Sequence, residues 1–163
     1  MKTRRLVMLS LIALFVSTSS LQAATVNGAK IHSTLTGQGR TIIFVHRWTC
    51  EETSWSEQIP VLSRKYRVIT IDLPGHGQSD PPKAGKFSMD VFANAIQAAW
   101  AEANVYRVIL AGHSMGGPVV YRYAQLHRST PWPSSLSTPR FSKVLTSGPS
   151  SIRHFPASSV RTA

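Results

Sequence analysis

The chain has 163 residues, which is enough for one domain of modest size. It is basic, with 18 lysines and arginines against 7 aspartates and glutamates, and every acidic residue lies at or before Glu102. A basic balance is compatible with binding to nucleic acid or to an anionic membrane. These charges are spread thinly along the sequence and are not interleaved with aromatic residues, so we expect no nucleic-acid binding.

The first 23 residues have the pattern of an export signal. A basic start is followed by an apolar run over residues 6–16 and by small and polar residues over 17–23, with a cleavage site after Ala23. The basic residues are Lys2, Arg4 and Arg5. The apolar run is too short to span a bilayer comfortably, and an uncleaved anchor is the alternative. We predict an exported protein, periplasmic or secreted, that begins near Ala24 and has no stable membrane span.

The first half of the mature chain has the patterns of three strands, a helix and a loop. We expect strands at 30–35, 41–45 and 67–71, a helix at 54–63 and a loop at 72–80. Thr41–Val45 is almost wholly apolar and rich in β-branched residues, which is typical of a strand buried on both faces of a parallel sheet. The helix opens with the capping-box pattern Ser54-x-x-Glu57 and contains Pro60, which we expect to kink it.

Apolar residues at helical spacing predict an amphipathic helix from Ser88 or Met89 to Ala103. An apolar strand over 107–111 follows, and then a helix-compatible segment that ends at Leu126. Strands that alternate with helices indicate βαβ units with right-handed crossovers. We therefore predict an α/β fold, with a mostly parallel sheet flanked by helices.

Residues 127–163 differ in character from everything before them. They are rich in Ser, Thr, Pro and Arg and contain no carboxylate side chain. Such a composition buries too little apolar surface to offset its chain entropy. We predict a largely irregular tail, in which Lys143–Thr146 is the only candidate for a short strand.

The stretch Gly112-His113-Ser114-Met115-Gly116-Gly117 is typical of a nucleophile elbow, in which a strand turns sharply into a helix. The serine at the apex has a strained backbone, so small residues are needed two positions before and after it. Gly112 and Gly116 meet that need. The start of the following helix directs free N–H groups at an incoming anion, such as a tetrahedral intermediate. We predict Ser114 as a nucleophile.

Three segments, in this order and at this spacing, resemble the α/β-hydrolase superfamily in its lipase, esterase and small acyl-hydrolase region. They are Val45-His46-Arg47-Trp48, the run from Asp72 to Ser79, and the elbow. The resemblance covers residues 26–126. A serine at the elbow argues against relatives that use aspartate there, such as epoxide hydrolases and haloalkane dehalogenases.

The resemblance implies roles for three residues. Ser114 would be the nucleophile, and the backbone N–H groups of Met115 and Trp48 would form the oxyanion hole, each worth on the order of 3 kcal/mol of barrier. The substrates would be small molecules of carboxylic ester or acyl type. Nothing indicates a cofactor, and His and Cys do not occur at metal-ligand spacing, so no metal is expected either.

Two features depart from the family pattern. The family usually has glycine where this chain has Arg47. If that position needs a positive φ, arginine would cost about 1–2 kcal/mol there and displace the Trp48 N–H.

The second departure concerns the catalytic triad. The family's triad continues after the serine with Asp or Glu and then His, whereas no acidic residue follows Ser114. His127 and His154 do follow it, one at the expected helix end and one in the tail. Turn, cap or structural roles explain the earlier candidates, which are His46, His76, His113, Asp72, Asp80 and Asp90.

These departures predict a hydrolase truncated after the elbow helix, with a tail produced by a frameshift. A serine without a general base is a poor nucleophile, so we expect little activity. The alternative is a non-catalytic remnant or binding module that keeps half of the fold. In either case the strand at 107–111 would be an exposed apolar edge, which favours self-association. The chain then divides into a signal peptide (1–23), a partial hydrolase domain (24–126) and a tail (127–163).

Overall fold

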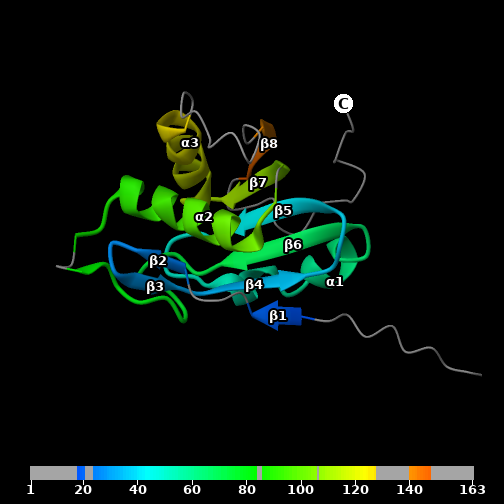
Figure 1. The fold of residues 1–163 in the computed structure, drawn as a ribbon, viewed down its shortest axis with the longest axis horizontal. Coiled ribbons are helices and arrows are strands. Elements are labelled where there is room, and N and C mark those ends of the chain that lie inside the picture. The colour runs from blue at the N-terminus through cyan, green and yellow to red at the C-terminus, as the bar shows by residue number, and fades with distance from the viewer. Residues whose placement is uncertain (1–17, 21–23, 84–85, 106, 128–139, 148–163) are drawn as a thin grey trace, which may run out of the picture.

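The computed structural model describes residues 18–20, 24–83, 86–105, 107–127 and 140–147, and for 18–20 and 140–147 it describes the backbone (Figure 1). The strands are β1 (Thr18–Ser20), β2 (Ala24–Val26), β3 (Ala29–Ile31), β4 (Ser33–Thr36), β5 (Arg40–Val45), β6 (Tyr66–Ile71), β7 (Arg107–His113) and β8 (Arg140–Ser147). The helices are the 3₁₀ helix η1 (Glu52–Trp55), α1 (Ile59–Leu62), α2 (Met89–Ala103) and α3 (Gly116–Leu126).

A sheet of six strands in the order β1-β4-β6-β5-β7-β8 forms the centre of the molecule (Figure 1). β5 is parallel to β6 and β7, and β7 is parallel to β8. β4 pairs antiparallel with β6 and with β1, while β2 and β3 form a separate antiparallel pair. The predicted α/β fold with a mostly parallel sheet is confirmed.

The larger core lies between the sheet and helices α2 and α3. Apolar residues of the central strands, such as Ile43, Ile69 and Leu110, are fully buried against these helices. The α2 side supplies Phe92, Ile96 and Trp100, which recur at helical spacing. The predicted boundaries of this helix are confirmed. The side chain of Ser88 accepts a hydrogen bond from the N–H of Val91, and Asn104 in the left-handed conformation ends the helix.

The opposite face of the sheet carries a smaller core. Ile42, Phe44 and Ile109 alternate with the residues of the first core, because successive side chains of a strand point to opposite faces. Trp55 of η1 covers them, with its ring 4.6 Å from that of Phe44. Burial on both faces explains why these strands are almost continuously apolar.

An ion pair joins the two helices of the larger core. Asp90, in the first turn of α2, accepts hydrogen bonds from Nε of Arg122 at 2.5 Å and from its Nη2 at 3.1 Å. This hydrogen bonding lowers the pKa of the Asp90 carboxyl below its ordinary value and raises the pKa of the Arg122 guanidinium. Asp90 therefore connects α2 to the helix that follows the elbow.

Two predicted elements are wrong in their boundaries. Instead of one kinked helix at 54–63 there are two short pieces, η1 and α1, and no side chain caps either of them. The capping-box pattern Ser54-x-x-Glu57 is not used, because Ser54 lies inside η1 and Pro60 lies in the first turn of α1, where proline is tolerated. The strand expected at 30–35 is divided into β3 and β4 at His32.

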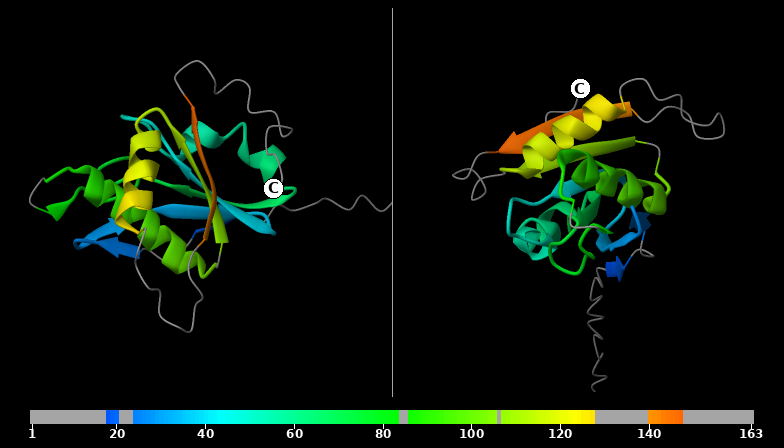
Figure 2. Two further views of the ribbon diagram at one scale, coloured as in Figure 1. Left: turned by 90° about the horizontal axis from the view of Figure 1, so that it is seen from above. Right: turned by 90° about the vertical axis from the view of Figure 1, so that its left-hand side faces the viewer.

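The tail contains more regular structure than its composition predicts. The expected strand at 143–146 extends over the whole of β8, which pairs parallel with β7 from Arg140 to Ser147 (Figure 2). The elbow strand β7 therefore lies between β5 and β8. The prediction that its apolar edge is exposed is wrong, because β8 covers it.

Candidate active site

The elbow predicted from the sequence is present. Ser114 follows the last residue of β7, and only Met115 separates it from the first residue of α3. Its φ of 52° lies in the left-handed region that non-glycine residues rarely adopt. Ser114 is exposed, whereas β7 is buried from Val108 to His113. Met115 is the N-cap residue of α3. The chain therefore holds a hydroxyl at the rim of the sheet beside the start of a helix.

Close backbone contacts explain the two glycines that flank this turn. A Cβ atom added to Gly112 would lie 2.3 Å from the carbonyl oxygen of Gly116. A Cβ atom added to Gly116 would lie 2.2 Å from the carbonyl oxygen of Val45 and 2.9 Å from that of His46. All three distances are inside van der Waals contact, so the elbow requires glycine at each position. They also show that the start of α3 packs on the end of β5.

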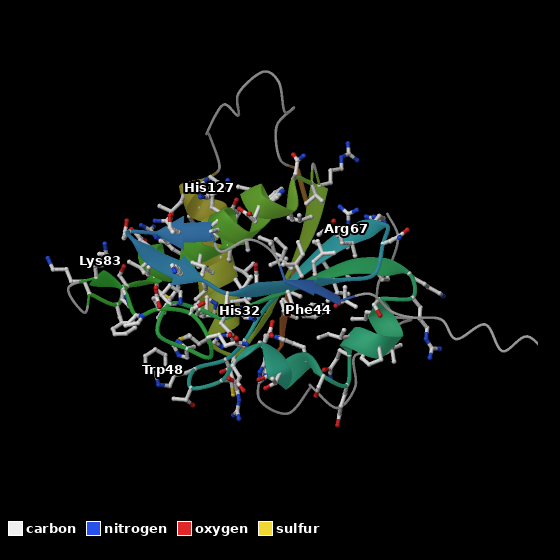
Figure 3. The ribbon with its side chains drawn as sticks, turned by 60° about the horizontal axis from the view of Figure 1, so that its bottom comes forward. His32, Phe44, Trp48, Arg67, Lys83 and His127 are labelled. Atoms are coloured by element: carbon white, nitrogen blue, oxygen red, sulfur yellow. The ribbon has the colours of Figure 1, made fainter. Side chains whose placement is uncertain are left out.

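The loop after β5 begins at the strand end next to the elbow, because Val45 and Gly112 are register partners. Trp48 in this loop is 54% exposed, and its ring lies at the surface (Figure 3). It makes edge contacts with the rings of His76 at 5.4 Å and Phe92 at 6.5 Å. The two backbone groups predicted for an oxyanion hole, those of Trp48 and Met115, therefore come from adjacent strand ends.

Arg47 does not carry the backbone strain expected from its position. The positive φ in this loop falls at Thr49, with φ of 55°, and Arg47 is not among the described non-glycine residues with positive φ. Its exposed side chain donates from Nε to Sγ of Cys50 at 3.0 Å. The left-handed conformation that would penalise arginine does not occur at residue 47.

His46 has a structural role. It is fully buried, its Nε2 accepts a hydrogen bond from the N–H of Leu73 at 3.0 Å, and its Nδ1 donates to the carbonyl of Arg47 at 2.7 Å. A backbone donor on one nitrogen and a backbone acceptor on the other define one neutral tautomer. Burial lowers the pKa of this imidazole below its ordinary value. With both nitrogens engaged, His46 has no free lone pair for general-base catalysis.

Asp72 holds the two loops at this end of the sheet together. Its side chain is buried, with Oδ1 accepting the N–H of Glu52 at 2.7 Å and Oδ2 accepting the N–H of Gln78 at 2.8 Å. Its carbonyl accepts the hydroxyl of Ser79 at 2.7 Å. The turn role predicted for this residue is confirmed, since its carboxylate bonds to backbone groups of both loops.

A second polar cluster adjoins Asp72 and was not anticipated from the sequence. Glu52 accepts hydrogen bonds from the hydroxyls of Thr34 at 2.8 Å and Thr70 at 2.9 Å, and its Oε1 lies 3.2 Å from Nε2 of His32. The two threonines are register partners on β4 and β6. No local motif indicates this cluster, because its members come from three separate segments. Its side chains point to one another, and this explains why the loop after β5 is held against β4.

The other histidines that were weighed as triad members lie on several different elements. His113 is buried at the end of β7, and His127 is the C-cap residue of α3, where its ring lies 4.3 Å from that of Tyr123. His76 bonds through Nδ1 to the carbonyl of Pro74 at 3.2 Å. His154 lies outside the described residues. No described contact pairs any of these imidazoles with the Ser114 hydroxyl.

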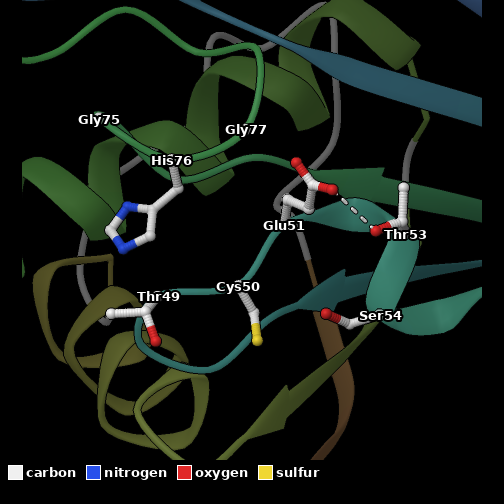
Figure 4. Close-up of a pocket in the computed structure, with 8 residues that line it drawn as sticks. All are labelled: Thr49, Cys50, Glu51, Thr53, Ser54, Gly75, His76 and Gly77. Atoms are coloured by element: carbon white, nitrogen blue, oxygen red, sulfur yellow. Dashed lines mark hydrogen bonds between the residues drawn. The ribbon is translucent and has the colours of Figure 1, made fainter.

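A polar pocket of about 440 Å³ lies between the loops that follow β5 and β6 (Figure 4). Its lining residues are Thr49, Cys50, Glu51, Thr53, Ser54, Gly75, His76 and Gly77. The hydroxyl of Thr53 donates to Glu51 at 3.0 Å within it. Ser114 is not among the lining residues, so this pocket is not the site at which the Ser114 hydroxyl would react.

Within the described ranges, no group of three or more His, Cys, Asp or Glu side chains is arranged to hold a metal ion. The helices in the same ranges are all too short or too polar to cross a bilayer.

Comparison with known proteins identifies the family. The family model described as "alpha/beta hydrolase fold" matches residues 40–155. This chain therefore belongs to the α/β-hydrolase family. The match continues well past Leu126, where the resemblance read from the sequence ended, and it includes β8.

Several curated relatives are identical to this chain at somewhat more than a third of the aligned residues. An uncharacterized protein of Mycobacterium tuberculosis is 34% identical over 109 residues, which are 67% of this chain and 32% of the relative. An AB hydrolase superfamily protein of Bacillus subtilis is 38% identical over 92 residues, which are 56% of this chain and 34% of the relative. A non-heme chloroperoxidase of Kitasatospora aureofaciens is 36% identical, also over 92 residues, which are 56% of this chain and 33% of the chloroperoxidase. The chain spans about a third of the length of these relatives.

Solved structures support the same assignment. An epoxide hydrolase has a TM-score of 0.62 at 28% identity and covers 69% of this chain and 39% of its own. A bacterial membrane phospholipase A has a TM-score of 0.61 at 28% identity, over 69% of this chain and 36% of its own.

Proposed function

We propose that this chain is an exported serine hydrolase that acts on carboxylic ester-type substrates, with Ser114 as the nucleophile. The observation that carries the proposal is the strained, exposed Ser114 between a buried strand and a helix start, with a φ of 52°. Strain of this kind is maintained where the surrounding structure requires it and is concentrated at functional sites. In this family such a turn presents the hydroxyl to substrate.

The oxyanion hole of the proposed enzyme consists of the backbone N–H groups of Met115 and Trp48. Close packing of Gly116 on the carbonyl oxygens of Val45 and His46 supports this assignment, because it keeps the two chain segments in contact. The tetrahedral intermediate carries its negative charge on the former carbonyl oxygen, and fixed N–H donors stabilise that charge as it develops.

Serine chemistry accounts for the choice of substrate class. The Ser114 oxygen attacks the ester carbonyl, the alcohol leaves with a proton, and water then hydrolyses the acyl-enzyme to release the acid. One similar solved structure is named a phospholipase A, and others are named epoxide hydrolases. Because the elbow holds serine, we favour ester cleavage over the aspartate chemistry expected for epoxide hydrolases.

We propose that turnover by this chain is slow. Its sequence has no Asp or Glu after Glu102, whereas the family's catalytic acid follows the nucleophile. His46 is engaged through both nitrogens and is not available as the base. A binding module that keeps the elbow without the triad would have this composition.

Labelling with a fluorophosphonate probe tests the role of Ser114. The full chain is incubated with the probe, alongside Ser114→Ala and, as a matched control, Ser56→Ala, which removes another exposed hydroxyl. We expect slow labelling of the wild type and of Ser56→Ala and none of Ser114→Ala. Equal labelling of all three chains would reject Ser114 as the nucleophile. A folded wild type that is not labelled would support the binding module.

Export is tested separately. Expression of the full chain with a C-terminal tag, followed by fractionation and N-terminal sequencing, should recover a mature protein outside the cytoplasm that begins near Ala24. Recovery of an uncleaved chain in the cytoplasm would reject the signal peptide and leave the hydrolase proposal untouched.

A further inference from the structure

The peptide group between Arg47 and Trp48 is held by its carbonyl oxygen. Nδ1 of His46 donates a hydrogen bond to this oxygen at 2.7 Å, and the N–H of Cys50 donates to it at 3.3 Å. A trans peptide is planar, so its N–H points in the direction opposite to its carbonyl. The two bonds therefore also set the direction of the Trp48 N–H, which is the donor proposed for the oxyanion hole.

The N–H of Trp48 is itself unused. In the part of the chain that the structure describes, no hydrogen bond engages it. An oxyanion hole needs a donor of this kind, which is oriented before the reaction and is not already bonded within the protein. The anchored carbonyl and the unengaged N–H belong to one rigid group.

His46 gives this group a firm support. Its ring is fully buried directly after β5, and its Nε2 accepts the N–H of Leu73, which follows β6, at 3.0 Å. The ring also lies against that of His76, with the centroids 5.2 Å apart. The carbonyl oxygen of His46 would be 2.9 Å from a Cβ atom on Gly116, the first residue of α3. The residue that holds the Trp48 peptide is thus packed against the helix of the elbow.

The turn that carries Trp48 is strained. The bond from the N–H of Cys50 to the Arg47 carbonyl closes a four-residue turn, and its third residue, Thr49, has a φ of 55° (Figure 4). Positive φ is a genuine outlier for a β-branched residue. Strain of this kind persists only where surrounding contacts maintain it, and it is concentrated at functional sites. One such contact is the hydroxyl of Thr49, which donates to the carbonyl of Trp48 at 2.7 Å.

We propose that His46 is a positioning residue, which orients the Trp48 N–H for the oxyanion that forms at Ser114. This inference rests on the proposed function, and it gives the buried imidazole a task beyond support of the fold. His46 touches no reacting atom, because it acts through the Arg47 carbonyl. Its contribution is a donor whose direction is fixed before the substrate binds.

Two substitutions separate support of the fold from orientation of the donor. His46→Asn places an amide N–H near the position of Nδ1, so it keeps the bond to the Arg47 carbonyl and leaves the buried N–H of Leu73 without its partner. His46→Gln places an amide oxygen near the position of Nε2, so it keeps the bond from Leu73 and releases the Arg47 carbonyl from the side chain. Each variant is the matched control of the other.

The full chains are compared by urea denaturation and by the second-order rate constant of fluorophosphonate labelling. We expect His46→Asn to be the less stable variant, because an unpaired buried N–H is costly, and to be labelled within a few-fold of the wild type. His46→Gln should be more stable than His46→Asn and yet be labelled about tenfold more slowly than the wild type, which is less than the loss of a hundredfold or more on removal of a whole donor. Labelling that follows stability, or equal rates in all three chains, would overturn the proposal.

NMR of the wild type gives a readout that depends neither on labelling nor on the folding of a variant. The imidazole of His46 should carry its proton on Nδ1, and the Trp48 N–H should have an order parameter of about 0.85, as in rigid backbone, although this residue is exposed. A proton on Nε2, or an order parameter below about 0.6, would overturn the proposal.

The same measurement separates this proposal from that of the nucleophile. A folded wild type that is not labelled would reject the role of Ser114. A Trp48 N–H that becomes mobile in His46→Gln and stays rigid in His46→Asn would then still support its orientation by the imidazole. Equal order parameters in the two variants would overturn that orientation.

Discussion

Asp72 is a buried carboxylate that resembles a catalytic acid by residue type and acts as a structural anchor. Its two oxygens accept backbone N–H groups from the loops after β5 and β6, at 2.7 and 2.8 Å. Bonds of this kind to a charged acceptor are among the stronger ones in a folded protein. The loop that carries Trp48 therefore depends on a residue outside the reaction centre.

Replacing Asp72 with alanine should destabilise the fold strongly. The partly buried N–H groups of Glu52 and Gln78 would lose their charged partner, and we expect a loss of about 3 kcal/mol in the free energy of unfolding. Urea denaturation measures it. The control is Asp80→Ala, at an exposed residue whose carboxylate accepts the N–H of Lys30, and it should lose less than about 1 kcal/mol. Equal losses would show that Asp72 is not the anchor.

His46 gives the stability of the protein a pH dependence. Burial lowers the pKa of its imidazole in the folded state below its ordinary value of about 6.5. The unfolded chain therefore binds more protons than the folded one as pH falls below about 6.5, and stability decreases over that range. The stabilising contribution is complete above the unfolded pKa and is lost as pH falls toward the folded pKa.

The variant His46→Gln should weaken this dependence. We expect the wild type to lose more free energy of unfolding between pH 7.5 and pH 5.5 than the variant does, with unfolding followed by denaturant at both values. The comparison isolates His46, because the other histidines are common to both chains. A variant with the same or a steeper decrease would contradict the assigned neutral tautomer.

At the scale of elements, the ion pair of Asp90 with Arg122 couples α2 to the helix that begins at the elbow. The hydrogen bonds from Arg122 lower the pKa of the Asp90 carboxyl. The pair therefore contributes stability above the ordinary pKa of an aspartate, about 3.9, and that contribution is lost as pH falls through the lowered value. Both side chains are partly exposed, so salt screens the interaction.

Removing the Arg122 guanidinium should raise the pKa of the Asp90 carboxyl toward its ordinary value. In Arg122→Gln we expect the pKa of Asp90 to rise toward that of a free aspartate, as followed by NMR titration of its carboxyl carbon. Arg64→Gln removes an exposed charge from the other end of the sheet and should leave the value unchanged. An unaltered pKa in Arg122→Gln would mean that this pair does not persist in solution.

The elements also show where sequence patterns succeed. The spacing of Phe92, Ile96 and Trp100 predicted α2 to within a residue, because one face of a long helix must be apolar throughout. The capping-box pattern at Ser54 failed because it is a short local signal. The backbone there is fixed instead by Asp72, which accepts the N–H of Glu52, and by burial of Trp55. A contact between distant segments thus overrode a local preference.

At the scale of the whole molecule, β8 decides whether β7 is an edge. Val144 of β8 is the register partner of Leu110, in the middle of the elbow strand. Pairing along this strand satisfies backbone groups that would otherwise be open to another chain. The stability of the elbow therefore depends on a segment whose composition resembles a disordered tail.

A proline at residue 144 should expose β7. Val144→Pro removes a backbone N–H and interrupts a strand pairing, so we expect faster hydrogen exchange of β7 amides and more self-association in light scattering. A control is Val61→Pro, at an exposed position next to Pro60 in the short helix α1, which is not paired with β7. Unchanged exchange in β7 would contradict the pairing with β8.

The sequence by itself determined the features that are local along the chain. Gly112, Ser114 and Gly116 lie within five residues, so their spacing encodes the elbow, and the apolar runs encode the buried parallel strands. The tertiary structure alone decided which groups Asp72 and His46 bind, since each of them bonds to the backbone of a loop distant in the sequence. It also decided where charge accumulates. Arg40, Arg107 and Arg140 are far apart in the sequence and become neighbours in the sheet, because parallel strands bring their first residues to one end.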